Sequence, residues 1–96
     1  MSVQYVAEMD IDQGEKIHIR SIVKPKCEQD LPFTIRAARY ELIDPDGSME
    51  DSGDCRIDEH EIDAIIAPRM IGTYRLKYIY EIADETWVDN VKLRVG

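Results

Sequence analysis

The chain has 96 residues, enough for one small domain, and we expect residues 1–96 to share a single hydrophobic core. With 20 acidic and 12 basic residues the formal net charge is -8, which argues against partners that are bound by neutralising phosphates, such as nucleic acids and anionic membranes. No apolar run approaches the roughly 18 residues of a membrane span, and the N-terminus lacks the layout of a signal peptide, so we expect a cytoplasmic protein.

Apolar and polar residues alternate with a period of two along most of the chain, which predicts half-buried β-strands. Seven segments are predicted as strands from this pattern or from the turn residues that flank them: 3–11, 17–23, 33–43, 49–57, 61–67, 73–80 and 87–95. Turn-forming residues separate them, and no segment is a convincing helix. Short strands in this number predict an all-β sandwich of two antiparallel sheets.

Four segments carry more specific predictions. The apolar face changes phase by one residue at 37–38, which predicts a β-bulge, and 44–47 has the composition of a hairpin turn. Segment 49–57 is the weakest strand, interrupted by Gly53 and rich in acids, as expected of an edge strand. Segment 61–67 is a strand or a helical turn, and its short length before a proline favours the strand.

The sequence Gly72-Thr73-Tyr74-Arg75-Leu76 resembles the start of the sixth strand in immunoglobulin-like domains. The resemblance implies an all-β, seven-stranded antiparallel Ig-like β-sandwich, with another small β-sandwich or barrel as the rival. It implies that the Tyr74 hydroxyl bonds back to the chain just upstream, and that Leu76 stands where antibody-type domains have a core cysteine. The buried disulfide and core tryptophan of those domains are absent, with Phe33 or Tyr40 expected in place of the tryptophan, so the chain is similar to bacterial and prophage Ig-like modules.

The last strand begins near Trp87, whose place in the alternation fits two positions. Its ring either fills the core or lies exposed at a sheet edge as an anchor for another chain, and we favour the core. The segment 73–80 and the segment 87–95 are joined by the short link 83–86, so we expect them to pair as an antiparallel hairpin.

Candidates for catalysis are few. His18 is expected to be a solvated strand residue and His60 to lie in a polar connection, and neither stands in a recognisable nucleophilic arrangement. Cys27 and Cys55 have no metal-site spacing, and we expect two free thiols, with a disulfide between them as the alternative. We therefore expect no enzymatic activity and no cofactor.

Acidic residues concentrate between residues 44 and 63, where nine of them stand against Arg56 alone, so this segment accounts for the whole net charge. Oxygen ligands in loops could hold calcium, and the candidates for such a site are Asp44, Asp46, Asp51 and Asp54. Only the opening of a calcium-binding loop motif is present, so we expect no metal. The residues that we expect to form an acidic interaction patch are Asp54, Asp58, Glu59, Glu61 and Asp63.

Basic residues crowd the second and third predicted strands. They are Lys16, Arg20, Lys24, Lys26, Arg36 and Arg39. If they stay apart from the acidic segment in the fold, the molecule has one basic and one acidic region, a distribution that favours complementary docking. The alternative, which we favour, is that these charges belong to ordinary solvated faces.

These observations favour a non-catalytic module for protein–protein contact or self-association, plausibly a bacterial or prophage-encoded assembly component located in the cytoplasm or in a phage particle. The alternative is a ligand-binding module that takes calcium or a carbohydrate at the end loops 44–48 and 84–86. An enzyme that uses His60 is the least favoured class.

Overall fold

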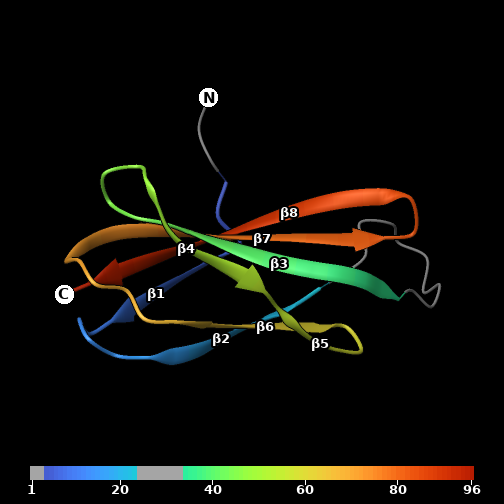
Figure 1. Cartoon of the computed structure of the whole chain (residues 1–96), viewed down its shortest axis with the longest axis horizontal. Helices are drawn as coiled ribbons and strands as arrows, with labels where there is room; N and C mark the ends of the chain where they lie inside the picture. Colours follow the sequence, from blue (N-terminus) through green and yellow to red (C-terminus); the bar gives the residue numbers. More distant parts are fainter. Residues whose placement is uncertain (1–3, 24–33) are drawn as a thin grey trace.

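The computed structural model describes residues 4–23 and 34–96, and this part of the chain consists of β-strands joined by turns (Figure 1). The strands are β1 (Ala7–Ile11), β2 (Ile17–Ile22), β3 (Ile35–Ile43), β4 (Met49–Asp54), β5 (Arg56–Asp58), β6 (Glu61–Ile66), β7 (Gly72–Ile82) and β8 (Glu85–Val95). Sheet A has five strands in the order β1-β8-β7-β3-β4, and sheet B has three in the order β2-β6-β5. The prediction of an all-β fold with two packed sheets is confirmed.

Two details of the predicted fold are wrong. The described residues form eight strands rather than seven, because the predicted strand 49–57 divides at Cys55, where the chain leaves sheet A and joins sheet B. The sheets are also not wholly antiparallel, since β1 pairs with β8 in parallel. Alternation in one sequence cannot distinguish a strand that stays in its sheet from one that changes sheets, nor the direction of a partner strand.

Local predictions for the turn, the bulge and β6 are confirmed. Asp44 and Gly47 close the β3–β4 hairpin through a 3.0 Å bond between the Gly47 amide and the Asp44 carbonyl, with Gly47 at a φ of 87°. The register of β3 against β7 shifts between Ile35 and Ala37, about one residue before the predicted position. Segment 61–67 is a strand rather than a helical turn, because β6 pairs antiparallel with both β2 and β5.

The core lies between β7 and sheet B. The alternate residues Tyr74, Leu76, Tyr78 and Tyr80 are all at most 2% exposed, as the alternation predicts. Facing them across the sandwich are the inner side chains of β2 and β6, which include Ile19, Ile62 and Ile66. Buried hydroxyl groups need hydrogen-bond partners, and each of these three tyrosines has one.

The Tyr74 hydroxyl donates to Glu50 Oε1 at 2.7 Å and accepts from the Met70 amide at 2.9 Å and the Arg69 amide at 3.2 Å. It therefore bonds back to the chain just upstream, as expected. The Tyr78 hydroxyl crosses the sandwich and donates to the Ile19 carbonyl of β2 at 2.6 Å. Burial is the main cause that raises the pKa of Tyr78 above its usual value, so its hydroxyl stays a donor at neutral pH.

Tyr80 and Trp87 close one end of the core. The Tyr80 hydroxyl donates to Asp89 Oδ2 at 2.7 Å, and the two aromatic rings meet edge to face with centroids 6.0 Å apart. Trp87 is half-buried and packs against the core, while its Nε1 donates to Glu85 Oε2 at 2.7 Å. The Trp87 ring thus packs against the core, as in the favoured prediction, but remains partly exposed.

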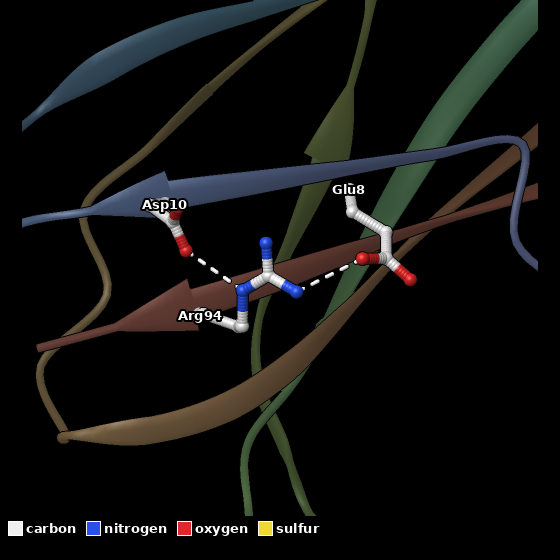
Figure 2. Close-up of polar contacts among 3 residues, drawn as sticks. All are labelled: Glu8, Asp10 and Arg94. Atoms are coloured by element: carbon white, nitrogen blue, oxygen red, sulfur yellow. Dashed lines mark hydrogen bonds and ion pairs between the residues drawn. The ribbon is translucent and has the colours of Figure 1, made fainter.

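Strand β1 is fixed to the edge of sheet A by one arginine of β8 (Figure 2). Arg94 Nε donates to Asp10 Oδ1 at 2.7 Å, and Arg94 Nη1 donates to Glu8 Oε2 at 2.9 Å. The hydrogen bond from Arg94 holds the pKa of Asp10 below its usual value. Glu8 and Asp10 lie on one face of β1, opposite Lys92 and Arg94 in the parallel register, so their charges meet bases on the outer face of sheet A.

We predict that Tyr78→Phe lowers the free energy of unfolding by about 1 to 2 kcal/mol, because it removes a buried hydrogen bond between the sheets while the ring still fills the core. Urea denaturation measures this difference. The control is Tyr5→Phe, at an exposed ring whose hydroxyl makes no hydrogen bond within residues 4–23 and 34–96, and its effect should stay within about 0.5 kcal/mol. Equal effects of the two substitutions would contradict the role of this hydroxyl.

Candidate functional site

The predicted acidic interaction patch lies mainly on sheet B. Asp58 ends β5, Glu59 lies in the β5–β6 turn, and Glu61 and Asp63 belong to β6. Asp54 ends β4 in sheet A, yet it lines the same hollow as Asp63, which contains about 330 Å³. The structure therefore brings the five residues to one region of the molecule, where β4, β5 and β6 meet.

Basic residues lie within this region, so the hypothesis of separate acidic and basic regions is wrong for the residues that the structure describes. In the strand register, Asp63 lies opposite Arg20 of β2 on one side and opposite Arg56 of β5 on the other. Arg39 of β3 likewise lies opposite Asp54 of β4. Strands distant in sequence become neighbours in a sheet, which places acids and bases side by side. Lys24 and Lys26 lie outside the described residues.

Asp63 is the centre of this surface. Its Oδ2 lies 2.7 Å from His18 Nδ1, with the His18 side chain 58% exposed and that of Asp63 only 16% exposed. Its second oxygen, Oδ1, is buried and accepts no hydrogen bond from the described residues. His18 is thus solvated, as expected, but the carboxylate fixes its ring. Sequence alternation alone could not reveal this contact, because 45 positions separate the two residues.

A carboxylate that orients an imidazole provides two of the three members of a catalytic triad, but Cys55, the thiol among the described residues, is a poor nucleophile. Cys55 is half-buried, and burial together with the charges of Asp63 and Asp54 raises its pKa to about 12. The thiol therefore stays protonated at neutral pH, whereas nucleophilic cysteines act as thiolates. Cys55 is a free cysteine. Cys27, which we expect to be a second free thiol, lies outside the described residues.

The four calcium candidates are engaged in local structure or lie apart. Asp44 Oδ1 accepts from the amides of Asp46 and Ser48, both at 2.9 Å, and this stabilises the turn. Asp51 Oδ2 accepts from the Tyr40 hydroxyl at 3.1 Å. Within the described ranges no three histidine, cysteine, aspartate or glutamate side chains come together in a way that could hold a metal ion.

Sheet B also exposes apolar side chains beside these charges. On its outer face, Ile65 of β6 is 44% exposed and Ile22 of β2 is 66% exposed. A strand over 61–67 turns Ile62, Ala64 and Ile66 inward and Ile65 outward, so the alternation already indicates that Ile65 is exposed. Nothing in the sequence singled out Ile22.

The chain matches no protein-family model, and no curated protein matches it. Among the described residues there is no helix long and apolar enough to cross a membrane. The candidate site therefore has to be interpreted from its own geometry.

We predict that the rate of alkylation of Cys55 keeps rising at pH values where the rate for an ordinary thiol is already constant, because the pKa of Cys55 is raised to about 12. In a Cys27→Ser variant, the rate of reaction with iodoacetamide should still rise about tenfold per pH unit between pH 9 and 10, where an ordinary thiol of pKa about 8.5 has levelled off. Asp63→Asn should increase the rate at a fixed pH, because it removes a neighbouring negative charge, and the control Asp12→Asn should not. A rate that levels off near pH 9 would contradict this account of Cys55.

Proposed function

We propose that the chain is an immunoglobulin-like module that binds other proteins and carries out no catalysis. The sheet order supports the fold assignment. In variable-type immunoglobulin domains, strands D, E and B form one sheet and strands C′, C, F and G form the other. The order β5-β6-β2 corresponds to D-E-B, and β4-β3-β7-β8 corresponds to C′-C-F-G.

The position of Tyr74 gives further support to this assignment. In many immunoglobulin-like domains a tyrosine near the start of strand F bonds back to the backbone of the preceding link. Tyr74 is the third residue of β7, and its hydroxyl accepts from the Met70 amide in the β6–β7 link. Leu76 occupies the position of the second core cysteine and is fully buried.

The observation that carries the proposed binding function is the composition of the outer face of sheet B. Ile22 and Ile65 are exposed there next to Arg20 and Arg56, and neither arginine forms an ion pair with another described residue. Exposed apolar side chains combined with arginines are typical of protein interfaces. The acidic interaction patch borders them and supplies charge complementarity to a partner.

A ligand-binding module for calcium or carbohydrate is less well supported. Carbohydrate sites stack sugars on exposed aromatic rings, and Tyr74, Tyr78 and Tyr80 are buried in the core. In the loop 44–48, Oδ1 of Asp44 already accepts from two backbone amides.

The charge of the chain bears on the kind of partner that it binds. We propose that the partner is a protein or a second copy of the chain, rather than a nucleic acid or a membrane, because the net charge is -8. We further propose that the chain is a component of a bacterial or prophage-encoded assembly, located in the cytoplasm or in the phage particle.

We predict that Ile65→Asp abolishes binding to the natural partner while the fold is kept, because a charge on the outer face of sheet B has to be desolvated in the interface. The matched control is Val88→Asp, at an equally exposed side chain (43% against 44%) on the outer face of sheet A. Affinity capture from the native host, with quantification of each captured protein by mass spectrometry, measures the effect. The proposal fails if no partner is captured, or if both variants retain it equally. Light scattering in parallel detects self-association.

A further inference from the structure

The two sheets differ in width, and this leaves part of β1 uncovered. Ala7 and Met9 of β1 pair in register with Val91 and Leu93 of β8, whose side chains face sheet B in the core. Partners in register point to the same side of a sheet, so Ala7 and Met9 also face inward. Both are nevertheless exposed, Met9 by 38%. No described strand lies beneath them, because sheet B ends at β2.

The outer edge of β2 has backbone hydrogen-bonding groups that no described strand pairs with. Val23 donates its amide to the His60 carbonyl at 2.8 Å, which continues the β2–β6 register. Because hydrogen-bonded and non-bonded pairs alternate in an antiparallel ladder, the odd-numbered residues of β2 bond to β6. The even-numbered residues His18, Arg20 and Ile22 therefore point their amide and carbonyl groups away from β6, to an edge that no other described strand covers.

A groove adjoins this edge. It contains about 490 Å³ and runs between the start of β1 and the end of β2, which lie on the same side of the sandwich (Figure 1). Its lining includes Val6, 61% exposed, and Ile22, 66% exposed, together with Tyr80 and Trp87. An apolar side chain entering beside β2 would be covered by these four residues.

The other sheet edges are protected, and that of β2 is less so. Edge strands usually avoid pairing by being short, charged or irregular. Strand β5 has three residues, β4 carries three acids and a register shift against β3, and β1 carries Glu8 and Asp10. Strand β2 has six residues in regular register, with no proline, lysine or acid.

Charge on β2 indicates what kind of segment would fit. Arg20 lines the groove and forms no ion pair with a described residue, although Asp63 lies beside it in the register. A carboxylate on an added strand, opposite Arg20 on the outer face, would give a favourable cross-strand pair.

We propose that the edge of β2 binds a single extended segment of a partner protein, which adds a fourth strand to sheet B beneath β1. The segment carries an apolar side chain that enters the groove and an acidic residue opposite Arg20. A second copy pairing through its own β2 would not supply the acidic residue, because β2 carries no acid. This inference rests on the proposed function and names the partner's chemistry.

The experiment uses the whole chain and a phage-displayed library of random octapeptides as the probe. We expect selected peptides with alternating apolar residues and at least one acid. Synthetic versions should lose at least tenfold in affinity when alternate backbone amides are N-methylated, and much less when the other set is methylated, because only one set faces β2.

Variants of the protein locate the site. Ile22→Asp should weaken peptide binding at least tenfold, and Ile71→Asp, at an equally exposed isoleucine (65% against 66%) outside the groove, should leave it unchanged. Arg20→Glu should weaken acidic peptides by up to about fivefold. Thermal unfolding of each variant verifies that it is folded.

The inference is overturned if no peptide is selected, if N-methylation has no alternating effect, or if Ile22→Asp and Ile71→Asp bind equally well. Its failure is distinct from failure of the proposed function. If Ile65→Asp loses the natural partner while no peptide binds β2, the protein-binding function stands and only the strand-addition mode is wrong.

Discussion

Tyr74, Tyr78 and Tyr80 bury their rings on the inner face of β7, so each hydroxyl needs a partner inside the protein. Tyr78 meets this need across the sandwich at the Ile19 carbonyl, which ties β2 to sheet A. Tyr74 bonds to Glu50 and to the link before β7, and Tyr80 bonds to Asp89. The Tyr78 contact crosses between the sheets, so the position of sheet B against sheet A depends on it and on the packing of the buried rings.

Sheet B has three strands under a five-stranded sheet A, and this asymmetry determines where the molecule can bind. On one side, the chain passes from β4 to β5 at Cys55 and connects the two sheets. On the other side, Arg94 fixes β1 to β8 (Figure 2). The inward-facing side chain of Met9 on β1 remains exposed beyond sheet B. The open side, between β1 and β2, has an apolar groove and backbone groups that no described strand pairs with. The exposed residues that we connect with function, Ile22 and Ile65, belong to the smaller sheet.

Much of the fold could be predicted from the sequence, because local rules govern it. The alternation along β7 identifies its buried face, and the residue types at 44–47 identify the turn. What the sequence could not reveal depends on contacts between distant strands. Strand β1 pairs in parallel, the chain changes sheets at Cys55, and Arg20 lies beside Asp63, although each local pattern is compatible with other pairings. The residues of the acidic interaction patch and Arg56 could therefore be named from the sequence, whereas the placement of Arg20 and Arg39 beside them could not.

The binding site depends on β2 being a free edge, which no other strand among residues 4–23 and 34–96 covers. Amide hydrogen exchange, measured residue by residue by NMR, tests it most directly. The account predicts alternating protection along β2, with slow exchange at Ile19 and Ser21, which bond to β6, and exchange at least a hundredfold faster at His18, Arg20 and Ile22. Uniform slow exchange over Ile17–Ile22 would contradict the account, because it would mean that a further strand already occupies this edge.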